Sequence, residues 1–314
     1  MIAGFNDGGN LLAAACASRT IQPAVAFIVI TAGAMAGPLI AGTAVALTIG
    51  HGIVNYREVG FVPLAAGMLG GASAILLAYA VRLPTTASVA LVSATVGSLW
   101  AMGEIRQLIW SGVEKTAFSL VGSMVVGFVA GAILYTLAWL AFSRVSFRTG
   151  NRLMRLQYLT VFAQAVGYGS NDAEKMMGSI VAAMSLSAAS PAFAVPFWVV
   201  LVSVLSFAAG MAFGGVRVAK TIGGKLFRIR PLHALCFQLA AATTVIVASA
   251  LGGPLSTTET TASAILGTGA ATNPRGLRWQ VALDLVAAWF LTVPAGLACG
   301  VVATLILRPI LQGA

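Results

Sequence analysis

Residues 4–10 read GFNDGGN, and residues 169–175 read GSNDAEK. Each stretch places an Asn-Asp pair shortly after a glycine, at the head of an apolar segment. The chain has only eight acidic residues, and a carboxylate surrounded by hydrocarbon is costly and usually marks an ion or substrate path. The matched aspartates, Asp7 and Asp172, therefore indicate a duplicated functional element, and this duplication decides the fold.

A second short element is duplicated in step with the first. Residues 84–88 read PTTAS, and residues 254–258 read PLSTT. The aspartates are 172 − 7 = 165 positions apart and the prolines 254 − 84 = 170, and Trp110 and Trp279, each before a long apolar run, are 169 apart. Duplication at half-length is typical of a secondary transporter built from two repeats.

The composition indicates a polytopic membrane protein. Apolar residues make up 59% of the chain and charged residues only 8%, whereas a soluble domain carries about 25% charged residues. Three cysteines are scattered within apolar stretches, so the sequence indicates no disulfide framework and no cofactor or structural metal site.

The net charge of +10 is concentrated in two short loops between apolar segments. The basic clusters are Arg144, Arg148, Arg152 and Arg155, then Arg217, Lys220, Lys225, Arg228 and Arg230. This placement is the positive-inside pattern of a membrane protein, so we place both loops in the cytoplasm. Topology and lipid headgroups explain the charge better than a nucleic-acid partner does.

The apolar segments predict an all-α membrane protein. They cover about 3–17, 23–50, 59–81, 115–142, 156–187, 193–216, 231–252 and 279–307. Two shorter stretches, 84–102 and 254–272, are short and polar for a span, so each is predicted to form a re-entrant helical hairpin. We divide the chain into a first transmembrane repeat (1–142), a basic cytoplasmic linker (143–155) and a second repeat (156–314).

Two points about this topology stay open in the sequence. Four spans per half predict parallel repeats, whereas an inverted pair needs an odd count, so a segment is miscounted or a hairpin crosses fully. In addition, only six residues precede Asp7, about 9 Å of helix. The first motif is therefore expected nearer the membrane surface, or behind a leading half-helix that this sequence lacks.

The Asn-Asp motifs have the chemistry of a cation site. The preceding glycine allows a helix to break or bend, and broken helices are where transporters place ion sites. Unwound carbonyls, an Asn oxygen and an Asp carboxylate form a hard oxygen cage suited to Na⁺, or offer a carboxylate to H⁺. The alternative for each Asp is a helix N-cap in a loop.

The Pro-Ser/Thr elements have the chemistry of an anion site. Proline starts a helix well, and the hydroxyls after it lie where the first backbone N–H groups are unpaired. Such a helix N-terminus is suited to an anion, and two facing each other can hold a tetrahedral oxyanion. The alternative is simple helix capping, which for residues 84–88 has equal weight.

These residues carry a resemblance to the inorganic phosphate transporter family of secondary carriers, specifically its bacterial low-affinity branch. Residues 169–178 (GSNDAEKMMG), and the series 214–217, 231–233 and 254–258, are similar to that branch. The resemblance covers nearly the whole chain and implies uptake of phosphate with a cation, Na⁺ or H⁺, by alternating access of two repeats. It implies a cation site of Asn6, Asp7, Asn10, Asn171 and Asp172. It implies oxyanion contacts from Ser256, Thr257 and Thr258, with Thr85, Thr86 and Ser88 as weaker counterparts.

The chain also departs from the family pattern. Glu259 stands where the family often has a histidine, and its charge repels phosphate unless it is protonated or paired, by Lys175 or by an arginine. Lys175, one turn beyond Asp172, is either a counter-ion or a salt bridge that holds the broken helix.

The functional prediction is a cation-coupled phosphate carrier in the bacterial plasma membrane, with no enzymatic activity. A permease for sulfate or another tetrahedral oxyanion is the close alternative. An intramembrane aspartyl protease is a remote one, because it leaves the Pro-Ser/Thr elements unexplained. The expected partners are inorganic phosphate, the coupling cation and the lipid bilayer; a homo-oligomer is left open.

Overall fold

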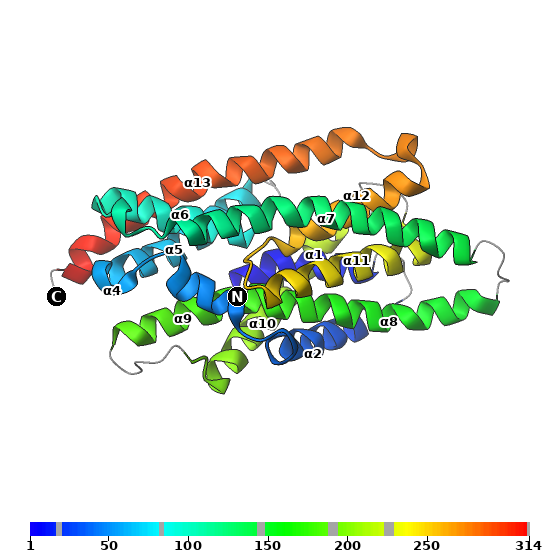
Figure 1. The fold of residues 1–314 in the computed structure, drawn as a ribbon, viewed down its shortest axis with the longest axis horizontal. Helices are drawn as coiled ribbons and strands as arrows, with labels where there is room; N and C mark the ends of the chain where they lie inside the picture. The colour runs from blue at the N-terminus through cyan, green and yellow to red at the C-terminus, as the bar shows by residue number, and fades with distance from the viewer. Residues whose placement is uncertain (17–20, 82–84, 143–147, 188–193, 223–228, 313–314) are drawn as a thin grey trace.

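The computed structural model describes residues 1–16, 21–81, 85–142, 148–187, 194–222 and 229–312, and its elements within these ranges are all helices (Figure 1). This confirms the all-α prediction. The first half contains η1 (Gly4–Gly8), α1 (Gly9–Cys16), α2 (Pro23–Ala41), α3 (Ala44–Leu47), η2 (Thr48–Gly52), α4 (Tyr56–Val59), α5 (Phe61–Ala80), α6 (Ala87–Met102), η3 (Ile105–Gln107) and α7 (Trp110–Phe142). The second half contains α8 (Arg148–Tyr168), η4 (Gly169–Ala173), α9 (Glu174–Leu186), α10 (Phe197–Ile222), α11 (Pro231–Ala250), α12 (Thr257–Thr272), η5 (Pro274–Gly276) and α13 (Trp279–Gln312).

The length and the apolar surface of the helices are those expected in a lipid bilayer. Among the described residues, five helices are long and apolar enough to cross a membrane: α2, α5, α7, α11 and most of α13. The outermost, α7 and α13, expose large apolar side chains such as Phe118 and Phe290. Because these side chains face outward in a chain with few charges, we assign their surroundings to lipid, as for a multi-pass membrane protein.

The two halves share one order of elements. The starts of α5, α6 and α7 (61, 87 and 110) precede those of α11, α12 and α13 (231, 257 and 279) by 169 or 170 positions. The matching helices nevertheless run in opposite directions. In Figure 1, α7 runs from left to right, whereas α13 runs from right to left, toward the C-terminus.

The short helices α6 and α12 each return the chain to the end of the molecule at which the preceding long helix began. In Figure 1, the pair α5–α6 enters from the left and the pair α11–α12 from the right, so their tips point toward the middle. The segments 59–81 and 231–252, counted as separate spans in the sequence, are therefore hairpin arms. Removing one from each half leaves three other segments per half, the odd count that opposite orientation requires; the first of them, 3–17, begins near the middle of the molecule (Figure 1).

The halves exchange packing partners. Helix α10 packs on η1 and α1, and α2 packs on α8 and η4. Likewise, α12 packs on α7, and α6 packs on α13. Each Asn-Asp motif is thus covered by a helix from the other half.

The predicted linker, residues 143–155, is only partly covered by the described residues. Residues 143–147 lie outside the described residues, and Arg148 already begins α8. In the second basic cluster, Lys225 and Arg228 also lie outside them. The first motif is not near an end of the helices, because the N-terminus lies close to the middle of their length in Figure 1.

Candidate functional site

Each Asn-Asp pair lies in a π-helical turn. Asn6 and Asp7 belong to η1, and Asn171 and Asp172 to η4, and these turns start 169 − 4 = 165 positions apart. Turn η4 continues directly from α8 into α9, and η1 continues into α1. The helix distortion expected at each glycine is a π-helical turn, in which the helix is widened by one residue, a form that recurs at functional sites.

The motif glycines allow neighbouring helices to approach closely. A Cβ atom at Gly4 would overlap the carbonyl oxygen of Phe207 in α10, and one at Gly169 would overlap that of Ala34 in α2. Backbone atoms cannot rotate away as a side chain can. The glycines are thus required by helix packing between the halves, in addition to the helix distortion predicted for them.

The Asn side chains fix the hairpin tips. Asn6 Nδ2 donates to the Thr85 carbonyl at 2.8 Å, and Asn171 Oδ1 accepts from the Leu255 N–H at 3.2 Å. Thr85 and Leu255 both directly follow the duplicated prolines. Asn171 Nδ2 also donates to Ser249 Oγ at 2.9 Å and to the Gly253 carbonyl at 3.2 Å. In each half, the asparagine therefore ties the motif to the hairpin of the same half.

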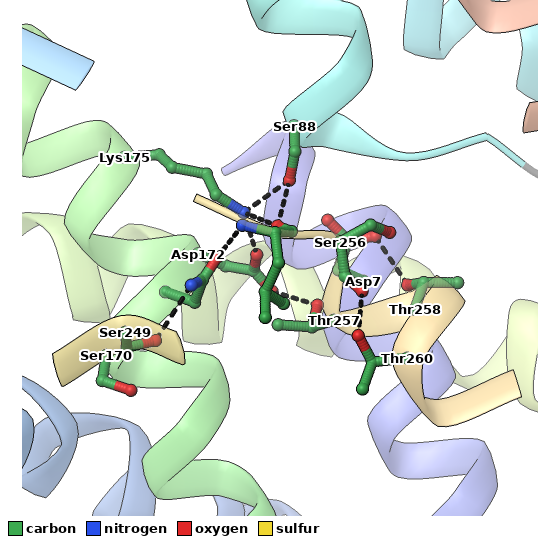
Figure 2. A network of polar contacts seen from close by, with 12 residues as sticks. Asp7, Ser88, Ser170, Asp172, Lys175, Ser249, Ser256, Thr257, Thr258 and Thr260 are labelled. Carbon is green, nitrogen blue, oxygen red and sulfur yellow. Dashed lines mark hydrogen bonds and ion pairs between the residues drawn. The ribbon is translucent and has the colours of Figure 1, made fainter. Parts of the chain in front are cut away.

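The two aspartates meet at the start of α12 (Figure 2). Asp7 Oδ1 accepts from Thr258 Oγ1 at 2.8 Å and from Asn6 Nδ2 at 2.9 Å. Asp172 Oδ2 accepts from Thr257 Oγ1 at 2.6 Å. Both carboxylates are almost fully buried, with exposed fractions of 2% and 1%. Consecutive hydroxyls of one helix thus join motifs that are 165 residues apart.

Lys175 is the cationic member of this cluster. Its Nζ donates to Asp172 Oδ1 at 2.8 Å and to the Leu255 carbonyl at 2.6 Å, and it also donates to Ser88 Oγ. Ser88 in turn donates to the same carbonyl at 2.7 Å. Lys175 thus forms a salt bridge within its motif and contacts both hairpins.

Glu259 has no hydrogen bond to Lys175. It lies close to Thr86, at the start of the other hairpin's α6. Its Oε1 atom and the Thr86 hydroxyl are both buried without a hydrogen-bond partner among the described residues. A buried polar atom without a partner costs free energy, so Glu259 is weakly paired even though it lies against Thr86.

The remaining predicted hydroxyls take separate roles. Ser256 is the N-cap of α12, and its Oγ accepts the Glu259 N–H at 3.2 Å. The Thr85 hydroxyl accepts from Thr292 of α13 at 3.1 Å, so Thr85 joins the site through its carbonyl instead. The backbone of Asn10 is in α1, but its side chain lies outside the described residues.

Sequence reasoning missed several supporting residues. Gln164 and Tyr168 of α8 both hydrogen-bond to the Thr261 hydroxyl of α12, at 3.0 and 3.1 Å. Their spacing of four on an apolar helix just before Gly169 is a signal that could have identified them. Glu174 accepts from the Val45 and Ala46 N–H groups at 3.0 and 3.3 Å, a contact between distant segments that no local pattern reveals.

Comparison with known proteins agrees with this architecture. The family described as "Phosphate transporter family" matches residues 3–155 and 143–300. The chain is 32% identical to a "Probable low-affinity inorganic phosphate transporter" of Rhizobium meliloti, covering 93% of this chain and 88% of the relative. It is 30% identical to a protein of the same description from Bacillus subtilis, covering 98% and 94%.

A solved structure has the same fold. It is titled "The sodium-dependent phosphate transporter" and matches with a TM-score of 0.85 at 24% sequence identity, covering 98% of this chain and 96% of that one. The named relatives are transporters, which removes the intramembrane protease from consideration.

Proposed function

The chain belongs to the phosphate transporter family, and we propose that it carries inorganic phosphate across the bacterial plasma membrane together with a coupling cation. The proposed site consists of the residues through which the two motifs contact the two hairpin tips. They are Asn6, Asp7, Asn171, Asp172, Ser88, Thr257 and Thr258.

One observation carries this proposal: Thr257 and Thr258, in the first turn of α12, each donate to a different motif aspartate. A helix N-terminus with hydroxyl donors favours an oxyanion, while the carboxylates favour a cation. Each threonine has a single hydroxyl hydrogen. A cation or proton that satisfies an aspartate therefore frees a donor for phosphate, which couples the two ligands.

The buried charges also favour a cation partner. Among the described residues, the carboxylates of Asp7, Asp172, Glu174 and Glu259 are buried with Lys175 as the only buried lysine or arginine. When these four carboxylates are ionised, a phosphate anion adds to an excess of negative charge. Buried charges need compensation, so protons or cations must enter with the substrate. Since the relative of known structure is titled sodium-dependent, Na⁺ is the first cation to test.

The hairpins provide a route to alternating access. Their tips approach from opposite ends of the molecule (Figure 1) and meet at the aspartates. We assign the α5–α6 hairpin to the outer side and the α11–α12 hairpin to the cytoplasmic side, following the basic clusters. Retreat of one tip at a time opens the site to one side of the membrane.

The test is uptake of labelled phosphate into vesicles containing the purified protein, with Na⁺ and pH gradients imposed separately. We expect uptake that accumulates phosphate only when one of these gradients is present. Excess unlabelled phosphate should compete strongly and excess sulfate weakly, because phosphate keeps a proton to donate to Asp7 or Asp172 and sulfate does not. Equal competition by sulfate would put the sulfate permease first, and uptake indifferent to both gradients would exclude coupling.

A further inference from the structure

The Lys175 ammonium is surrounded by oxygen atoms of the kind that hold a metal cation. Its contacts are a carboxylate oxygen of Asp172, the main-chain carbonyl of Leu255 and the hydroxyl of Ser88. They come from three places: η4, the tip before α12, and α6. Figure 2 shows the ammonium between Ser88 and Asp172, and Lys175 is 1% exposed. Carboxylate, carbonyl and hydroxyl oxygens are also the ligands of hard cations.

The first motif lacks this built-in charge. The position that matches Lys175 is 175 − 165 = 10, where the chain has the uncharged Asn10. The hydrogen bonds that the described side chains donate to Asp7 come from neutral groups, the Asn6 amide and the Thr258 hydroxyl. Asp172, in contrast, has a full positive charge 2.8 Å from its Oδ1. The duplicated site is thus chemically asymmetric.

We propose that the Lys175 ammonium occupies the cation position of the second motif, so that an exchangeable coupling cation binds at the two motifs only beside Asp7. This inference rests on the proposed cation-coupled transport. A cation attached to the chain cannot be carried across the membrane. The protein therefore moves one cation fewer per phosphate than the duplication of the Asn-Asp motif would give.

The variant Lys175→Ala tests this by removing the attached cation. In vesicles without ammonium and at low Na⁺, we expect phosphate uptake to fall by about tenfold or more, as for loss of a buried charge-assisted hydrogen bond. Added NH₄⁺ or Na⁺ should restore uptake, and the ratio of labelled Na⁺ to phosphate should rise by one in the Na⁺ case. Lys115→Ala is the matched control, because Lys115 is exposed on α7 and its loss should leave the wild-type ratio unchanged.

A cation-binding measurement tests the inference even if Lys175→Ala folds but does not transport phosphate. Titration of purified Lys175→Ala with NaCl or NH₄Cl should show one more saturable cation site than the wild type has. Adding Asp172→Asn to that variant should abolish the extra site. A folded Lys175→Ala protein that binds no additional cation would overturn the inference. Failure of the proposed function is separate, because it would appear as absent phosphate uptake by the wild type.

Discussion

Asp172 uses its two oxygens for two different donors, Lys175 and Thr257. In Asp172→Asn, one oxygen becomes an NH₂ group, which accepts no hydrogen bond, and the buried ammonium loses its carboxylate partner while it keeps the Leu255 carbonyl and Ser88. Breaking a buried ion pair costs about 3–5 kcal/mol, so we expect coupled uptake to fall to background while insertion is retained. Uptake is compared at equal amounts of membrane-embedded protein.

The matched control for this change is Asp284→Asn. Asp284 is exposed on α13, where it accepts from Gln280 at 3.1 Å, and its loss should leave uptake intact. We expect Asp7→Asn to resemble Asp172→Asn. Wild-type transport by well-expressed Asp172→Asn would remove the aspartates from the site.

The hydroxyls of Ser256 and Thr257 should have different roles. Thr257→Ala removes a donor that faces the site; losing one neutral donor costs about 0.5–1.5 kcal/mol, which raises the half-saturating phosphate concentration roughly 2- to 13-fold. Thr257→Ser keeps the hydroxyl and should keep the affinity. Ser256→Ala instead removes a helix cap, which costs about 1 kcal/mol of stability. Thermal unfolding and uptake measured on all three variants distinguish these roles, and an unchanged affinity in Thr257→Ala would leave that threonine a capping residue.

At the scale of the element, the sequence located the motifs but not the reason for their glycines. The spacing of Gly169 and Asp172 was visible, and it predicted a distorted helix. The helix that requires Gly169 to lack a side chain is α2, whose Ala34 is 135 positions away (169 − 34) and in the other half. Such a contact depends on how the halves dock, which no window of local sequence contains.

Gly169→Ala should therefore lower stability. The added methyl group overlaps a backbone carbonyl that cannot move aside, and overpacking of this kind costs about 1–3 kcal/mol. We expect a lower unfolding temperature for the purified protein and reduced uptake. Gly122→Ala is the control in α7, where a Cβ meets no atom within 4 Å; it should be neutral or slightly stabilising. Equal unfolding temperatures for the two variants would contradict the packing assignment.

At the scale of the whole molecule, the duplication and the two hairpins could be predicted, but the orientation of the repeats could not. The segments 59–81 and 231–252 are apolar and long enough to cross a membrane, so their composition resembles that of a span. Only their packing against α6 and α12 shows that they are hairpin arms. An apolar composition shows that a segment is buried in protein or in lipid, but it does not show where the chain reverses direction.

The opposite orientation of the repeats can be tested with Arg106 and Arg275. These exposed residues lie in η3 and η5, the matching turns that follow α6 and α12. In a background without the three native cysteines, a membrane-impermeant maleimide added to intact cells should label Arg106→Cys. It should label Arg275→Cys only after the membrane is permeabilised. Labelling of both from one side would indicate parallel repeats.

The exchange of helices between halves has a consequence for the synthesis of the protein. Asp7 leaves the ribosome well before α10, which packs on its helix, and before Thr258, which donates to it. Until then, the nascent chain holds a carboxylate in the bilayer without its native cover, a state that lipid disfavours. We therefore expect a chain that ends before α10 to keep this carboxylate uncovered and to be less stable in the membrane than a chain that includes α10 and α12.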